Sequence, residues 1–157
     1  MKVKMTKEEL LNLNYGMKNL SNLQENMKFS YGLTKNKRMI KNDVEVLDET
    51  REKLYTAIDW YTEFQEKARE ININFQKKIK EEIDPTKKKQ LEDANIKEIK
   101  KMEDKNPKLL KDFEEKREEF NKFLKEEIEI ELFKIKQENF PELTSKVTDL
   151  LFHIIEE

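Results

Sequence analysis

The side chains that most often carry catalysis are scarce in this sequence of 157 residues. The chain contains a single histidine, His153, and no cysteine, which excludes histidine-based hydrolytic triads of the usual kind and thiolate metal sites. A di-iron site in a helical bundle needs two Glu-x-x-His pairs, and two isolated glycines cannot form a phosphate-binding loop. We therefore expect a structural His153, no catalytic residue and no cofactor.

Magnesium held by carboxylates, as in helical nucleotide pyrophosphohydrolases, is the one enzymatic idea that remains. Acidic residues one helical turn apart can bind Mg²⁺ together with its waters. The candidates are Glu45, Asp48, Glu49, Glu52, Asp59 and Glu63. In a chain with 34 acidic residues, however, such spacings arise by chance. The sequence therefore predicts no metal site and no enzyme.

Four cations cluster within two turns near the start of the central helical stretch, namely Lys35, Lys37, Arg38 and Lys41. Such a group can contact phosphates or an acidic protein surface. The alternative is a solvated helix start, although cations are electrostatically unfavourable at a helix N-terminus. We take these four residues as candidates for partner binding.

Aromatic side chains are concentrated further along, at Tyr55, Trp60, Tyr61 and Phe64. This density is typical of the thickest part of a core, but exposed aromatic residues can also form a hot spot for a partner or for a second copy of the chain. Trp60 and Phe64 lie beside the main apolar stripe. They are therefore the second group of partner-binding candidates.

These candidates lie in a stretch from Leu33 to Ile83 that contains neither glycine nor proline. Apolar side chains recur there every three or four positions, which places them on one face of an α-helix. The stripe consists of Ile40, Val44, Leu47, Leu54, Ile58, Tyr61, Ala68, Phe75 and Ile79. The sequence thus predicts one continuous helix of roughly 75 Å, which Asp84–Pro85 ends.

Before this helix, residues 1–5 alternate apolar and basic side chains, as a half-buried strand does. Thr6 and Glu9 have the spacing of a capping box, so a helix should start there. Gly16 is a weak point in that helix. Its apolar stripe consists of Leu10, Leu13, Met17, Leu20 and then Leu23 or Met27. Residues 28–32 are expected to form the turn into the long helix, with Phe29 and Tyr31 packed beneath it.

After the proline at 85, residues 86–105 are the most polar part of the chain, and we expect either a short helix or a mobile arm over 84–106. Asn106–Pro107 has the signature of a helix start. The apolar face that follows would run back along the long helix, so that residues 33–83 and 107–127 form an antiparallel hairpin.

Between residues 128 and 136 the apolar period changes to two, which indicates a strand, with a continued helix as the alternative. A strand needs a partner for its backbone, and residues 1–5 have the same period. In that pairing the two lysines of the N-terminal segment face Glu129 and Glu131. Phe140–Pro141 is expected to open a C-terminal helix.

The composition is that of long helices with wide solvated faces, since 42% of the residues are charged and 36% are hydrophobic. We expect one domain over 1–157, without membrane spans or a signal peptide, in the cytoplasm. Residues 1–41 carry nine Lys or Arg against three Asp or Glu, and residues 113–157 carry seven against thirteen. The basic end could contact nucleic acid, unless the two ends lie together and neutralise each other.

The order of short motifs resembles a known group of proteins. A Leu-x-x-Leu helix at 10–13 is followed by FSYGLTKN at 29–36, a long charged helix, EIELFKI at 129–135, and FPELT at 140–144 before a last helix. This order is similar to that of small, Lys- and Glu-rich proteins of unknown function encoded by phages and prophages of low-GC Gram-positive bacteria. The resemblance implies a viral origin and a role in inhibiting a host protein, such as a nuclease of CRISPR-type antiviral defence. It assigns no site residue.

The sequence as a whole predicts a mostly α protein: a long antiparallel helical hairpin flanked by N- and C-terminal helices, with a small two-stranded β ladder. Its expected function is that of a non-catalytic protein-binding module with a host protein as partner. One alternative is a nucleic-acid-associated protein that uses the basic end. The other is a phage structural or assembly protein that forms a homo-oligomer.

Overall fold

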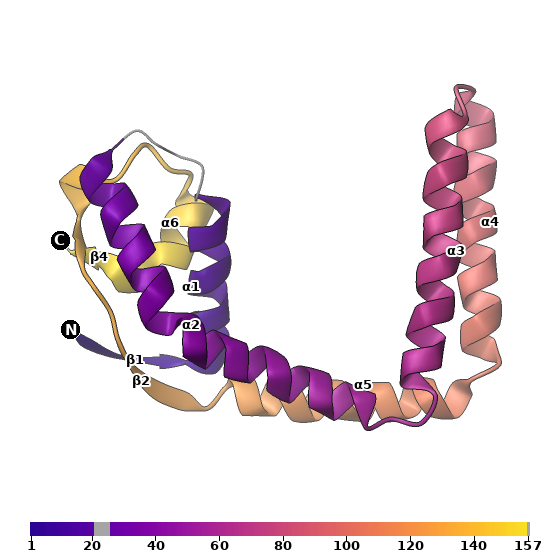
Figure 1. Ribbon diagram of the computed structural model, residues 1–157, viewed down its shortest axis with the longest axis horizontal. Helices are drawn as coiled ribbons and strands as arrows, with labels where there is room; N and C mark the ends of the chain where they lie inside the picture. Colours follow the sequence, from indigo (N-terminus) through magenta and orange to yellow (C-terminus); the bar gives the residue numbers. More distant parts are fainter. Residues whose placement is uncertain (21–25, 157) are drawn as a thin grey trace. The chain divides into compact units, whose positions relative to one another are not determined.

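The computed structural model describes residues 1–20 and 26–156, so Leu23 of the predicted N-terminal stripe lies outside the described residues. The described chain is mostly α, with six α-helices and two small sheets (Figure 1). It divides into two compact units, one of residues 1–51 with 119–157 and one of residues 52–118. None of the described helices is long and apolar enough to cross a membrane.

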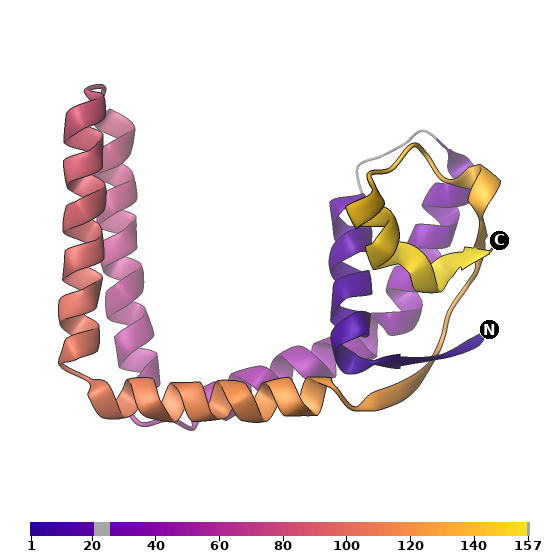
Figure 2. The same ribbon diagram turned by 180° about the vertical axis from the view of Figure 1, so that it is seen from behind.

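A two-stranded antiparallel sheet lies in the first unit. Strand β1 (Lys2–Thr6) lies beside β2 (Glu127–Glu131) (Figure 2). In the register of this pair, Lys4 lies opposite Glu129. The predicted pairing of the two segments is therefore confirmed, and the alternative of a continued helix is wrong. The second strand, however, ends at Glu131 and not at Lys136. Opposite charges of the two chain ends meet here, since Lys2 Nζ lies 2.7 Å from Glu129 Oε1.

Helix α1 (Lys7–Asn19) starts with the predicted capping box. The N–H of Glu9 donates to the Thr6 hydroxyl, and the N–H of Thr6 donates to the Glu9 carboxylate. The buried face of the helix consists of Leu10, Leu13, Gly16 and Met17. A Cβ at Gly16 would lie 2.9 Å from Leu150 Cβ, so this glycine permits close packing at a position where the sequence suggested only weakness.

Helix α2 (Met27–Thr56) begins earlier than predicted, and the expected turn at 28–32 is wrong. The side-chain oxygen of Asn26 accepts hydrogen bonds from two N–H groups of the first turn, which caps the helix at that point. Gly32 lies inside the helix, where a Cβ would stand 2.5 Å from side-chain atoms of Ile135. Close packing, and not a turn, therefore explains this glycine.

The C-terminal segment is less helical than predicted. Its elements are β3 (Ile135–Lys136), the 3₁₀ helix η1 (Gln137–Asn139), α6 (Ser145–Leu151), the 3₁₀ helix η2 (Phe152–Ile154) and β4 (Ile155–Glu156). The expected helix from Phe140 is therefore reduced to one of seven residues that starts after Thr144. Because β4 pairs in parallel with β3, its backbone is extended and cannot continue a helix.

The core of the first unit is formed by side chains from α1, α2, α6 and the segments around them. Its fully buried members are Leu10, Leu13, Met17, Phe29, Ile40, Leu132, Leu151, Ile154 and the polar Asn36. The predicted stripe of α2 is confirmed at Ile40, Val44 and Leu47, which are all buried. The N- and C-terminal helices thus share one hydrophobic core with the first half of α2.

The predicted continuous helix over 33–83 is wrong. Helix α2 ends at Thr56, and α3 (Tyr61–Glu81) follows a break in which Trp60 adopts a left-handed backbone with φ of 67°. Ile58, which lies in the break, is buried. The chain changes direction here without glycine or proline, so no local signal in the sequence marked the position.

Three aromatic rings in mutual contact lie beside the break in the second unit. Phe113 of α5 (Pro107–Leu124) lies 4.8 Å from Tyr55 and 5.9 Å from Tyr61, measured between ring centroids. Proline is the first residue of α5, as predicted. The break therefore lets α2, α3 and α5 contribute to one aromatic cluster. Tyr55 and Tyr61 are half-buried in it, so this segment is not the thickest part of a core that the sequence predicted.

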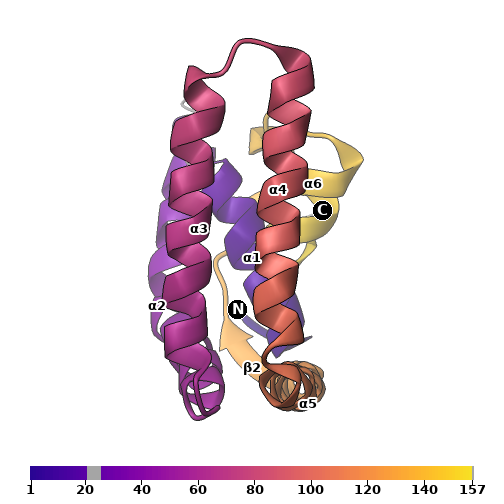
Figure 3. The same ribbon diagram turned by 90° about the vertical axis from the view of Figure 1, so that its right-hand side faces the viewer.

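The antiparallel helical hairpin is present, but its second helix differs from the prediction. Helix α3 packs along α4 (Pro85–Asp104), and the two helices run side by side in opposite directions (Figure 3). The segment 84–106, expected to be a short helix or a mobile arm, thus supplies the partner of α3. Asn95 Nδ2 donates to Asn72 Oδ1 at 3.2 Å across the seam.

Candidate functional site

Two of the four predicted cations, Lys35 and Arg38, lie beside an exposed aromatic residue, Tyr31. Tyr31 is one turn before Lys35 on α2 and is 60% exposed, and Met27 at the start of the same helix is 87% exposed. The ring of Phe133 packs edge-on against Tyr31 at 5.9 Å between centroids. The Lys35 ammonium lies 4.2 Å above the Phe133 ring, a cation–π contact.

Tyr31 stands between two surface hollows of about 670 and 440 Å³, and Met27 also lines both. The basic residues along the hollows are Lys28, Lys35, Arg38, Lys134 and Lys136. Glu156 is the one acidic residue among the described residues that line the two hollows. We call this surface the Tyr31 face; it consists of Met27, Tyr31, Phe133 and these five cations. It combines apolar anchors with a strongly positive rim.

The other two predicted cations lie apart from the Tyr31 face. Lys37 is half-buried, and its pKa lies below the usual value because burial disfavours the charged form and Lys18 of α1 repels it. Lys41 Nζ lies 3.7 Å from Glu45 Oε1, in an exposed pair one turn apart on α2. The structure thus places Lys35 and Arg38 on the Tyr31 face and Lys37 and Lys41 outside it.

Packing of α2 against the strand segment shapes the Tyr31 face. Gly32 lets α2 approach Ile135 closely, and Asn36 fixes the backbone of Phe133 with two hydrogen bonds of 2.8 Å each. These contacts hold Phe133 next to Tyr31. The face therefore depends on residues about a hundred positions apart in the chain.

Trp60 and Phe64, the second group of candidates, lie in the other unit. Trp60 is 70% exposed, in contrast to the core role that the aromatic density suggested for it. Phe64 is half-buried on α3 and lines a shallow hollow formed by side chains of that helix. A strained, exposed tryptophan is consistent with a contact residue, and its role in partner binding stays a prediction.

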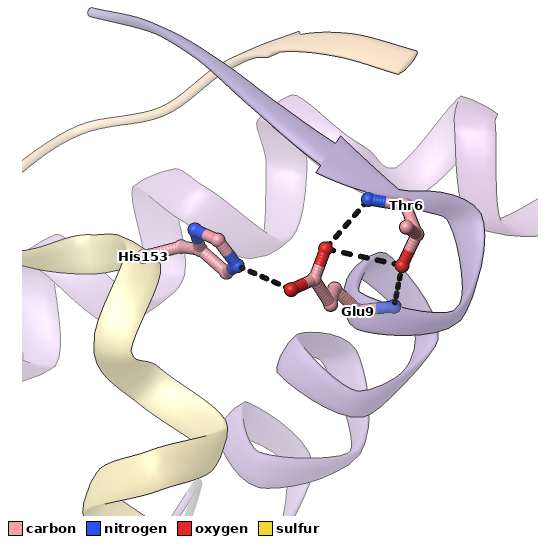
Figure 4. A network of polar contacts seen from close by, with 3 residues as sticks. All are labelled: Thr6, Glu9 and His153. Atoms are coloured by element: carbon pink, nitrogen blue, oxygen red, sulfur yellow. Dashed lines mark hydrogen bonds and ion pairs between the residues drawn. The ribbon is translucent and has the colours of Figure 1, made fainter. Parts of the chain in front are cut away.

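The single histidine lies in a polar network of three residues (Figure 4). His153 Nε2 lies 3.6 Å from Glu9 Oε1, and the other carboxylate oxygen of Glu9 accepts from the N–H and hydroxyl of Thr6. The hydrogen bond from the Thr6 backbone is the main cause that lowers the pKa of Glu9, and burial opposes it. The network fastens the C-terminal segment to the start of α1.

Acidic residues at the positions considered for magnesium do not form a metal site. In residues 1–20 and 26–156, no group of three or more His, Cys, Asp or Glu side chains is placed to hold a metal ion. Asp48, one of the candidates, accepts a hydrogen bond of 3.0 Å from Arg51. Glu45, another candidate, pairs with Lys41.

Three contributors to the Tyr31 face, Met27, Tyr31 and Phe133, were not among the predicted site residues. Tyr31 was expected to pack beneath the long helix, together with Phe29, but only Phe29 is buried. A usable signal was present, since Met27, Tyr31 and Lys35 are spaced four apart and so share one helix face. The expected turn at 28–32 concealed that spacing.

Comparisons with models of protein families, with curated proteins and with solved structures gave no match for this chain.

Proposed function

We propose that the protein is a non-catalytic protein-binding module and that the Tyr31 face binds an acidic surface of its partner. One observation carries this proposal: Met27 and Tyr31 are exposed between two hollows with five basic residues and one acidic residue around them. Tyrosine, methionine and arginine are enriched at protein interfaces. Aromatic anchors next to pockets are typical of binding hot spots.

The resemblance to small phage and prophage proteins supports the finer part of the proposal. Two of its motifs, at 29–36 and 129–135, include Tyr31 and Phe133, the residues whose rings pack together on this face. The partner is then a host protein, and binding blocks its activity, with a nuclease of CRISPR-type antiviral defence as the specific candidate. The finer part rests on the resemblance alone.

Affinity capture with matched variants tests the binding face. The tagged protein is incubated with a lysate of a low-GC Gram-positive bacterium, beside the variants Tyr31→Ala and Arg38→Ala and the control Tyr15→Ala. Tyr15 lies on α1 and is 61% exposed, so it matches Tyr31 in type and exposure. We expect one stoichiometric host protein with the wild type and with Tyr15→Ala, and its loss with the other two variants. Equal capture by all four proteins would contradict the proposed face.

Nucleic-acid binding is the second candidate, because the Tyr31 face also places aromatic rings among cations, as single-strand binding surfaces do. Counterion release then requires affinity for a single-stranded oligonucleotide to fall steeply with salt. A filter-binding series from low to high salt decides between the two functions. Tight, strongly salt-dependent binding that Tyr31→Ala abolishes would favour nucleic acid; no retention at low salt would exclude it.

A further inference from the structure

The outer edge of β1 has backbone groups directed away from β2. Met1 exchanges both of its backbone hydrogen bonds with Leu132, each at 2.8 Å, and the N–H of Lys7 donates to the carbonyl of Glu126. Hydrogen-bonded pairs alternate along an antiparallel ladder, so the odd-numbered residues face β2. The N–H and C=O groups of Lys2 and Lys4 therefore point to the other edge.

Within residues 1–20 and 26–156, no other strand pairs with this edge of β1. An edge that is not covered is a template for an additional strand. The β1–β2 sheet is therefore open at the β1 edge. One of its two faces is buried, because Met5 and Ile130 belong to the hydrophobic core.

A groove of about 690 Å³ runs along the open edge. Four consecutive residues of the strand segment, Met1–Lys4, line it, and no residue of β2 does. Because successive side chains of a strand point to opposite faces, a groove on one face would be lined by alternate residues. Consecutive residues show that this groove follows the backbone edge. Its opposite wall includes Phe152, which is 66% exposed, and Ile155.

The groove has a positive lining. Lys2, Lys4 and Lys134 line it, and none of the lining residues is an aspartate or glutamate. Lys2 is engaged with Glu129, whereas no ion pair of Lys4 occurs in the described part of the chain. The apolar side chains of Phe152 and Ile155 offer contacts for the alternate residues of an added strand. The groove thus suits an extended segment with acidic side chains.

We propose that an extended, acidic segment of a partner protein adds to the outer edge of β1 as a further strand. Main-chain hydrogen bonds to Lys2 and Lys4 provide the binding energy, and the lysines and Phe152 select the side chains, as in other strand-addition complexes. This site is separate from the Tyr31 face, since the two surfaces share Lys134 alone. Either proposal can fail without the other.

Backbone NMR of the ¹⁵N-labelled full chain tests strand addition. The probe is an octapeptide of alternating Glu and Val with blocked ends. We expect the amide signals of Lys2 and Lys4 to shift on titration and their hydrogen exchange to slow at least tenfold, while the Tyr31 amide is unchanged. An octapeptide of alternating Lys and Val, and a Glu–Val peptide with N-methyl groups on alternate residues, should produce neither effect.

Two variants at one position separate charge from backbone pairing. Lys4→Thr removes the charge but keeps the N–H, whereas Lys4→Pro also removes the N–H that points away from β2. We expect Lys4→Pro to bind the probe roughly fivefold more weakly than Lys4→Thr, the effect of one hydrogen bond. The N-methylated peptide gives the same test without any variant, should the proline disturb the strand.

Three results would overturn the proposal. The first is the absence of shifts at Lys2 and Lys4 at millimolar probe, and the second is equal binding of the N-methylated peptide. The third is protection of both amides that rises with protein concentration and without peptide, which would mean that a second copy of the chain covers the edge.

Discussion

Asn36 pairs with the backbone of Phe133 as a neighbouring strand would. Its side-chain amide donates to the Phe133 carbonyl and its side-chain oxygen accepts from the Phe133 N–H, both at 2.8 Å. Asn36 is fully buried, and it is the one buried polar side chain in the described residues. An amide matches a peptide group in having both a donor and an acceptor. This pair joins α2 to the segment that carries the ring against which Tyr31 packs.

Replacing Asn36 by leucine should destabilise the first unit strongly. Both polar groups of the Phe133 backbone would lose their partner in a part-buried position, at a cost of about 2–4 kcal/mol in the free energy of unfolding. Urea denaturation followed by circular dichroism measures this loss. The matched control is Asn42→Leu, at an exposed position of the same helix, where a change within about 0.5 kcal/mol is expected. Equal effects of the two substitutions would refute the role assigned to Asn36.

Gly32→Ala should also destabilise the first unit, although alanine is normally more favourable than glycine inside a helix by about 1 kcal/mol. The new Cβ would stand 2.5 Å from Cγ1 and Cδ1 of Ile135, and such overpacking costs about 1–3 kcal/mol. A double-mutant cycle with Ile135→Ala identifies the clash, because the cost of Gly32→Ala should shrink when Ile135 is truncated. A stabilising Gly32→Ala would show that α2 does not approach Ile135 this closely.

The capping box should make stability depend on pH. The pKa of Glu9 is lowered in the folded protein, chiefly by the hydrogen bond from the Thr6 N–H. The stabilising contribution of ionised Glu9 is therefore present above the pKa of the unfolded state and is lost as the pH falls through the lower, folded pKa. Glu9→Gln should reduce the free energy of unfolding more at pH 7 than at pH 3. The difference between the two reductions should be less than about 1 kcal/mol, because Glu9 is half exposed. An identical reduction at both pH values would be inconsistent with this linkage.

Trp60→Gly should stabilise the second unit. A residue other than glycine in the left-handed conformation is strained by roughly 1 kcal/mol, and the exposed indole offers little burial in return. Thermal unfolding should therefore shift upward by a few degrees. A marked decrease would mean that the indole packs within the protein.

Light scattering on the same variant tests the assembly role, since a homo-oligomer formed through Trp60 should dissociate while a monomer should be unaffected.

Local signals in the sequence were sufficient where the structure depends on neighbours in the chain. Thr6 and Glu9 form the predicted capping box, Pro85 and Pro107 begin helices, and the two alternating segments pair in the predicted register. For the capping box and the two helix starts, the responsible side chains lie within a few residues of one another. Long-range pairing of the strands could also be predicted, because only two segments had a period of two.

Features set by tertiary packing could not be predicted in the same way. The break before Tyr61 contains neither glycine nor proline, and the aromatic cluster with Phe113 accompanies it. Gly32 was taken as a turn residue because its real constraint, the approach of Ile135, comes from a distant segment.

For the candidate site, the predicted Lys35 and Arg38 do lie on the Tyr31 face. Phe133 is held on that face by the two hydrogen bonds between its backbone and Asn36. Nothing in the sequence near either residue indicates this contact.

Site-specific photo-crosslinking tests the central claim most directly. A benzophenone amino acid is introduced at position 31, or at position 15 as the matched exposed tyrosine on α1, and the full chain is irradiated in a lysate of a low-GC Gram-positive bacterium. The Tyr31 face predicts one dominant crosslinked protein from position 31 and none from position 15, with the crosslink abolished by Arg38→Glu. Crosslinks to that protein from position 15, or its absence at position 31, would contradict the account.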